Sequence, residues 1–91
     1  MKKIWIYKCL YFIDNEVNNL VKVFNSRERA VKYLENDFEK YKNYIRNVLK
    51  FEIIDETFYV DDTKAYYSVD DGEDCVTAMI TEDVIINEEM I

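Results

Sequence analysis

Residues 25–49 are the one long stretch of this chain in which apolar side chains recur with the spacing of an α-helix. Six of them fall three or four positions apart and would form one stripe on the helix: Ala30, Leu34, Phe38, Tyr41, Ile45 and Val48. Asn25 or Ser26 can cap the first turn, and Asn36-Asp37 is where we expect the helix either to bend or to split. A chain with one such helix can cover only one face of a β-sheet.

The remaining apolar segments predict β-strands. Five runs alternate with period two or are rich in aromatic and β-branched residues: 2–13, 20–24, 51–60, 64–69 and 75–80. Polar turns separate them at 14–19 and 70–73, and Asp71-Gly72 suits a type I′ hairpin. Residues 81–91 fit either a short helix capped by Thr81 or an edge strand. The order is β-β-α-β-β-β, so we expect one α+β domain over residues 1–91, with a mostly antiparallel sheet packed on one long helix.

The first predicted strand is apolar on both of its faces. One face carries Ile4, Ile6, Leu10 and Phe12, and the other carries Trp5, Tyr7, Cys9, Tyr11 and Ile13. Leaving the second set in water would expose an unusually large apolar patch. Either the C-terminal tail or a curl of the sheet covers it, or another chain does. In the last case Trp5, Tyr7 and Tyr11 form the oligomer face of a homodimer.

The chain lacks the residue types that most catalytic and cofactor-binding sites need. The chain has no His, one Gly and no Pro. Without His it lacks the commonest general base and transition-metal ligand, and one glycine cannot build a phosphate-binding loop. Ser26 and Ser68 have no base partner in sight. We therefore expect no enzyme activity and no cofactor.

The acids around Gly72 do not have the spacing of a calcium loop. Counting back from Gly72, the positions that should hold acids are Tyr67, Val69 and Asp71. We predict no metal site there, and a solvated turn instead.

The two cysteines and the apolar segments bear on the compartment. Cys9 and Cys75 have no ligand or redox spacing, so we expect reduced, buried thiols in a cytoplasmic protein. No run approaches the roughly 20 apolar residues that a membrane span needs. The N-terminal apolar run is interrupted by Lys8 and lacks the cleavage site of a signal peptide.

Charge is unevenly distributed along the chain. The net charge is −7, but residues 1–50 carry eleven Lys or Arg against six acids, and residues 51–91 carry one against thirteen. We hypothesise that a partner with a basic surface binds the second part. The predicted partner-binding residues are Asp61, Asp62, Tyr66, Tyr67, Asp70, Asp71, Glu73 and Asp74. Carboxylates would speed association and tyrosines would anchor it.

Direct binding of nucleic acid is disfavoured, although the first part of the chain is basic. Lysine and glutamate interleave along the predicted helix, and the acidic part would repel a polyanion.

In size, acidity, aromatic content and lack of catalytic groups, the chain resembles the small acidic inhibitors of bacteriophages and mobile elements, such as anti-CRISPR and anti-restriction proteins. The resemblance rests on these general properties alone, and no sequence motif supports it. It implies a non-enzymatic, stoichiometric inhibitor that binds a host nucleic-acid defence enzyme, as a mimic of DNA would, in the host cytoplasm. Immunity proteins and antitoxins share this character, and a homo-oligomeric accessory or scaffold protein is a third alternative.

Overall fold

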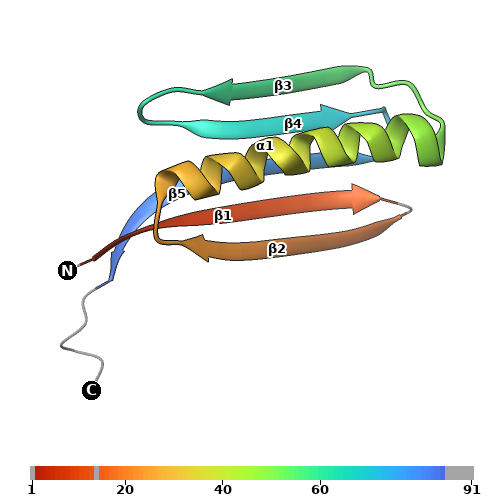
Figure 1. Cartoon of the computed structure of the whole chain (residues 1–91). Coiled ribbons are helices and arrows are strands. Elements are labelled where there is room, and N and C mark those ends of the chain that lie inside the picture. Colours follow the sequence, from red (N-terminus) through yellow and green to blue (C-terminus); the bar gives the residue numbers. More distant parts are fainter. Residues whose placement is uncertain (1, 14, 86–91) are drawn as a thin grey trace.

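The computed structural model describes residues 2–13 and 15–85. In chain order the elements are β1 (Lys2–Ile13), β2 (Glu16–Phe24), α1 (Arg27–Asn43), the π-helical η1 (Tyr44–Leu49) that continues α1, β3 (Asp55–Val60), β4 (Ala65–Asp70) and β5 (Cys75–Ile85). The five strands form one antiparallel sheet in the order β2-β1-β5-β4-β3 (Figure 1). The predicted α+β class and the β-β-α-β-β-β order are confirmed.

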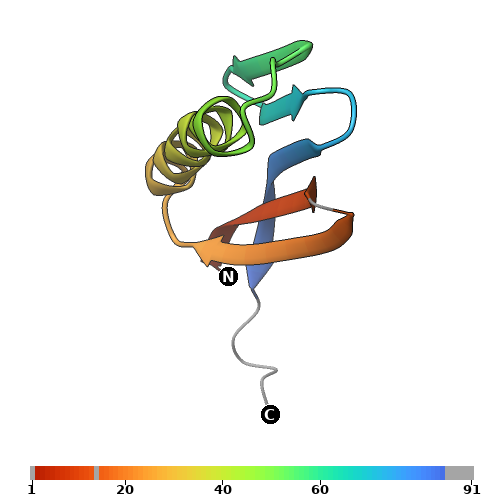
Figure 2. The same ribbon diagram turned by 90° about the vertical axis from the view of Figure 1, so that its right-hand side faces the viewer.

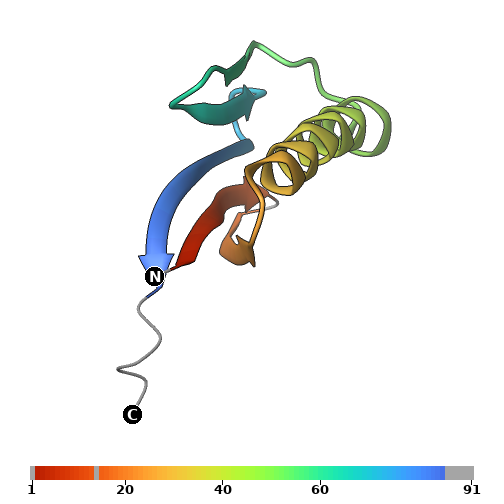
Figure 3. The ribbon, with the colours of Figure 1, turned by 60° about the vertical axis from the view of Figure 1, so that its left-hand side comes forward.

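The helix lies against one face of the sheet, and the sheet curves around it. Seen nearly along the helix, β3 and β4 lie above it and the β1–β2 hairpin lies below (Figure 2). A further view shows β5 bending along its length between these two halves (Figure 3). In the part of the chain that the structure describes, no helix has the length and hydropathy that a membrane crossing requires.

Ser26, one of the two predicted caps, begins the helix. Its backbone is extended, and its hydroxyl accepts a hydrogen bond from the Arg29 amide at 3.4 Å. The helix does not split at Asn36-Asp37, which was one of the two expected outcomes there, because α1 continues to Asn43. The helix instead widens to π geometry at Tyr44, and it ends at Lys50, which has a left-handed backbone with φ 61°.

The π-helical turn changes which residues face the sheet. In a π-helix the hydrogen bonds run from residue i to i+5, so each turn holds more residues than an α-turn. After the buried Ile45, the next inward side chain is therefore Leu49, which packs on the core. Val48, predicted to belong to the apolar stripe, is 62% exposed. That prediction is wrong for this reason.

Several strand limits differ from the predicted ones. β2 begins at Glu16, so most of the expected turn at 14–19 is strand, and β3 begins only at Asp55. β5 runs to Ile85, and its residues 81–85 pair with β1 but not with β4, so this part of the predicted tail is a strand with one side unpaired among the described residues and not a helix. Residues 86–91 of the predicted tail lie outside the described residues.

The hairpin between β4 and β5 is not the predicted type I′ turn. Asp70 pairs with Cys75, which leaves a loop of four residues, 71–74. Gly72 has a positive φ of 99°, but Asp71 does not. A type I′ turn needs positive φ at both central residues. The single glycine therefore serves a longer loop, in which the Asp71 amide donates to the Asp74 carbonyl at 3.0 Å.

The helix covers the aromatic face of β1. Tyr7 and Cys9 are fully buried beneath it, and Trp5 and Tyr11 pack against the same core. The prediction that Trp5, Tyr7 and Tyr11 form an exposed oligomer face is therefore wrong. These large side chains give the helix more apolar surface to bury than the other set, in which Leu10 is 52% exposed. The opposite face of the sheet is the one that α1 leaves open.

One buried polar contact joins the helix to the sheet. Asp37, in the middle of α1, is 6% exposed and accepts a hydrogen bond from the fully buried Tyr7 hydroxyl. Burial, and then the bond to Asp37, raises the pKa of Tyr7, so its hydroxyl remains a donor across the physiological range. Beside it, the Cys9 thiol lies 3.8 Å from the Tyr67 hydroxyl. A buried carboxylate without a donor would be costly, so this contact fixes the helix over β1.

We predict that Tyr7→Phe lowers the free energy of unfolding by about 1–3 kcal/mol, because the substitution leaves the Asp37 carboxylate buried without its donor. Adding Asp37→Leu to Tyr7→Phe should recover part of this loss. The measurement is urea unfolding followed by circular dichroism. Tyr33→Phe, which keeps its ring against Tyr7, is the matched control. A Tyr7→Phe protein as stable as the wild type would contradict the assignment.

Candidate functional site

The face of the sheet opposite α1 carries a shallow groove of about 720 Å³. Its floor is formed by β1 and β5 with Leu10, Thr77 and Met79, and Val21 of β2 and Tyr66 of β4 lie at its two sides. Leu10, Val21 and Met79 are each at least half exposed. The groove is therefore an apolar surface that the described residues leave in contact with water.

Charge is almost absent from this groove. Lys8 is the one charged residue among those that line it, and Asn19, Ser68 and Thr77 supply small polar groups. Lys8, Met79, Tyr66 and Val21 belong to one row of neighbours that runs across four strands. Antiparallel neighbours in such a row point to the same face, so these side chains form a continuous surface.

A stacked pair of tyrosines extends the groove toward the edge strand β3. Tyr66 of β4 and Tyr59 of β3 are paired in the sheet, with ring centroids 5.5 Å apart and ring planes 27° from parallel. Both are about 40% exposed. Partly exposed, rigidly held tyrosines are typical anchors of protein interfaces. Tyr66, one of the two predicted anchors, is therefore accessible on the open face.

The prediction that Tyr67 is a second anchor is wrong. It is 1% exposed, on the helix side of β4, and its ring packs against Phe38 with centroids 5.4 Å apart. Consecutive residues of a strand point to opposite faces, so Tyr66 and Tyr67 cannot both reach one partner.

The six predicted acids lie in two separate loops. Asp61 and Asp62 belong to the β3–β4 loop, whereas Asp70, Asp71, Glu73 and Asp74 lie in or beside the β4–β5 loop. The six residues of β4 separate the two loops by roughly 17–20 Å. Among the described residues there is no group of three His, Cys, Asp or Glu side chains placed to hold a metal ion.

Asp61 organises the first loop. Its Oδ1 accepts hydrogen bonds from the backbone amides of Thr63 and Lys64, each at 2.7 Å, and its Oδ2 accepts from the Tyr59 hydroxyl. Arg27 of the helix donates to the Asp61 carbonyl. The bond from Tyr59, followed by those from the two amides, holds the pKa of Asp61 well below its usual range. Asp62, by contrast, is exposed.

The second loop is built in the same way. Asp70 accepts a hydrogen bond from the Gly72 amide at 2.7 Å, and Asp71 accepts from the amides of Glu73 at 2.9 Å and Asp74 at 2.6 Å. Asp74 is 5% exposed, and Glu73 is exposed. Three of the six predicted partner-binding acids, Asp61, Asp70 and Asp71, therefore shape their own loops with their side chains, although their charge still contributes to the surface field.

Burial and the same carboxylates both act on the thiol of Cys75. It is half-buried at the start of β5, and burial, followed by repulsion from Asp70, Asp74 and Asp71, raises its pKa. Cys9 lies buried on the opposite face of the sheet, and its pKa is also raised, chiefly by burial. Both cysteines are free, as the sequence predicts, and neither has the lowered pKa of a nucleophile.

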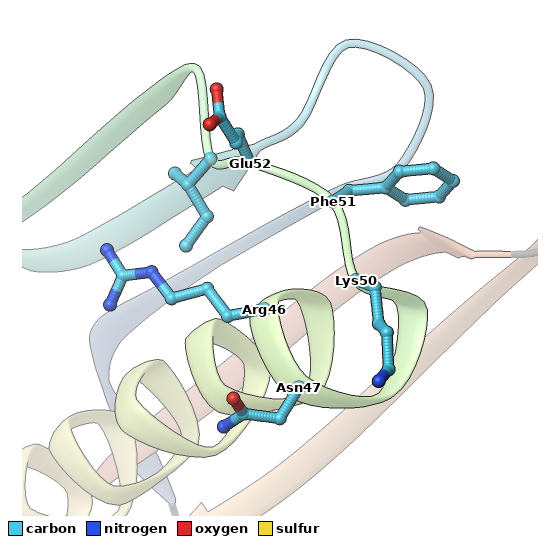
Figure 4. Close-up of a pocket in the computed structure, with 6 residues that line it drawn as sticks. Arg46, Asn47, Lys50, Phe51 and Glu52 are labelled. Atoms are coloured by element: carbon cyan, nitrogen blue, oxygen red, sulfur yellow. The ribbon is translucent and has the colours of Figure 1, made fainter.

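Two other hollows lie near the C-terminal end of the helix. One, of about 590 Å³, is lined by Arg46, Asn47, Lys50, Phe51, Glu52 and Ile53. Its labelled side chains diverge, with Phe51 pointing away from Arg46 (Figure 4). The other, of about 560 Å³, lies between β1, β2 and the helix beside Tyr11 and Tyr41. Neither gathers groups that could carry out a reaction together.

The sequence prediction missed the groove because it treated the aromatic face of β1, and not the face with Leu10, as the one that the helix leaves open. It also missed the first half of β2. Taking residues 14–19 as a turn removed Val17 and Asn19 from the sheet. The available signal was the period-two alternation of Val17, Val21 and Val23, all of which are more than half exposed on the open face.

Comparison with protein-family models, with curated proteins and with solved structures finds no match for this chain. The site is therefore interpreted from its own geometry.

We predict that the carboxyl of Asp61 titrates well below the usual Asp pKa of about 3.9. Because the pKa is lowered in the folded state, the ionised form stabilises the loop fully at neutral pH. That contribution is lost as the pH falls below the usual Asp value toward the lowered one. Carbon-detected NMR titration of the side-chain carboxyls measures this directly. An Asp61 that titrates at the usual Asp value would contradict the loop geometry.

Proposed function

We propose that this protein is a protein-binding module that acts by stoichiometric association and not by catalysis. The observation that carries the proposal is the apolar groove on the open face of the sheet, flanked by the Tyr59–Tyr66 stack. Exposed apolar surface of this kind is costly to a monomer unless a partner uses it. The two hollows near the C-terminal end of the helix gather no converging set of acid–base or nucleophilic groups, which supports the same conclusion.

The arrangement matches the anatomy of a protein interface. Such interfaces have an apolar centre with aromatic anchors and a charged rim that sets orientation and association rate. Here Leu10, Met79 and Tyr66 would form the centre. Acidic charge on the rim would come from the loops at the two ends of β4. Glu73 is exposed in one loop, and Asp62 is exposed in the other, where it also lines a hollow on the helix side with Trp5, Arg27 and Ile80.

The partner that this rim favours has basic surface on both sides of a projecting apolar or aromatic element. Enzymes that bind DNA or RNA carry such basic surfaces, because they must neutralise phosphates. We therefore propose a phage-type inhibitor that occupies the nucleic-acid-binding surface of a host defence enzyme, as anti-CRISPR proteins do. An immunity protein or antitoxin would use the same surface chemistry. The two free thiols are compatible with the cytoplasm as the place of action.

The test separates the rim from the centre. The partner is first captured from host lysate at low salt and identified, and its binding is then measured with purified proteins. Asp62→Lys with Glu73→Lys should slow association several-fold and flatten its salt dependence, because neither carboxylate has a structural hydrogen bond in its loop. Tyr66→Ala and Leu10→Ala should instead speed dissociation by about tenfold.

Glu28→Lys with Glu35→Lys is the matched control, since it makes the same change in charge on exposed positions of the helix. We also expect that the protein blocks binding of a labelled oligonucleotide to the captured enzyme and does not bind the oligonucleotide itself. If Asp62→Lys with Glu73→Lys slows association no more than the control pair does, and Tyr66→Ala and Leu10→Ala leave the dissociation rate unchanged, this surface is not the binding site.

A further inference from the structure

β2 is an unprotected edge of the sheet. Its nine residues pair with β1 in nine consecutive pairs without a bulge, and its other side has no neighbouring strand among the described residues. It contains no proline or glycine, and Val17, Val21 and Val23 are exposed. Proteins usually shorten, charge or bulge such an edge, because its free backbone groups pair readily with another strand.

The opposite edge of the sheet is protected in this way. β3 has six residues and begins with Asp55 and Glu56. Glu56 is held by Lys42 at 3.4 Å and by Arg46 at 3.7 Å, so charged side chains from the helix lie beside that edge. The difference between the two edges points to β2 as the side where another strand pairs.

We propose that β2 pairs with β2 of a second copy of this chain, antiparallel and about a two-fold axis through Asn19. In this register Glu16 lies opposite Lys22 of the other copy, and Val17 lies opposite Val21 of the other copy. Asn19 meets its own counterpart. The two-fold axis repeats each contact, so the interface contains two Glu16–Lys22 pairs and two Val17–Val21 pairs.

The charges of β2 select this register. Glu16 and Lys22 are its only two charged residues. They lie opposite Ile13 and Tyr7 in the sheet, so both point to the helix side, and both are exposed. The Lys22 ammonium lies 5.0 Å from the centre of the Tyr33 ring, which holds it at that side. Of the two-fold registers that keep each face on its own side, the one centred on Asn19 pairs these opposite charges with each other.

The pairing does not depend on the proposed function. It would produce a ten-stranded sheet with the two β3–β4 hairpins at its outer edges. The groove, the Tyr59–Tyr66 stack and the acidic loops of each copy would stay accessible. A dimer would therefore present two copies of the proposed binding surface on one continuous face.

A charge swap tests the register. Glu16→Lys alone and Lys22→Glu alone each place like charges opposite one another, and each should weaken dimerisation by about tenfold. The double swap should restore the wild-type dissociation constant. Residues 16 and 22 are six positions apart on one strand, roughly 20 Å, so restoration can arise only between copies. Sedimentation velocity over a concentration series measures the constant, starting from a wild type of twice the chain mass of 11.0 kDa.

Cross-linking gives a second measurement that does not depend on altered charges. In a Cys75→Ser background, Asn19→Cys should form a covalent dimer with a short bis-maleimide much faster than Glu35→Cys on the exposed side of the helix. The proposal is overturned if the wild type sediments as a monomer at every concentration. It is equally overturned if the double swap dimerises no better than the single variants, or if Asn19→Cys cross-links no faster than Glu35→Cys.

Discussion

One helix must cover a sheet of five strands, and this constraint determines which surfaces of the molecule are buried and which stay exposed. α1 can bury only one face, and it buries the face with Tyr7, Cys9, Tyr67 and Val76. The other face keeps its apolar residues in contact with water, and β2 keeps a free backbone edge. A small domain has little stability in reserve, so two exposed surfaces of this kind call for partners. Both proposals follow from these two surfaces, the open face of the sheet and the free edge of β2, which the helix does not cover.

The Tyr7–Asp37 contact explains which face the helix takes. A carboxylate in the middle of an otherwise apolar helical stripe cannot be buried without a donor, and β1 supplies one with Tyr7. The aromatic rings around it, Tyr33 against Tyr7 and Phe38 against Tyr67, fill the space between helix and sheet.

The two acidic loops are held by contacts of their own, separate from the core. Asp61 and Asp71 close the two hairpins with their own side chains, and the exposed acids next to them give the surface its charge.

The sequence predicts the class, the element order and the helix cap, because each depends on local patterns such as the alternation in β1 and the hydroxyl of Ser26. It does not predict the π-helical turn, which displaces Val48, since no local signal marks Tyr44 as its start. It also cannot decide which face of β1 is covered, because both are apolar and the choice depends on the distant Asp37. The predicted partner site combined Tyr66 with six acids, but β4 divides those acids between its two ends. Tyr67 is not available to a partner, because consecutive residues of a strand point to opposite faces and its side chain lies in the core.

The central claim is that the face of the sheet with Leu10 and Met79 is accessible to a partner, whereas the face under the helix is not. Solvent paramagnetic relaxation of methyl groups by a soluble gadolinium complex measures this directly. The account predicts strong enhancement for the methyl groups of Leu10, Val21 and Met79 and weak enhancement for those of Leu34 and Ile45. Equal protection of both sets in the isolated protein would contradict it, because the open face would then already be covered by the chain itself.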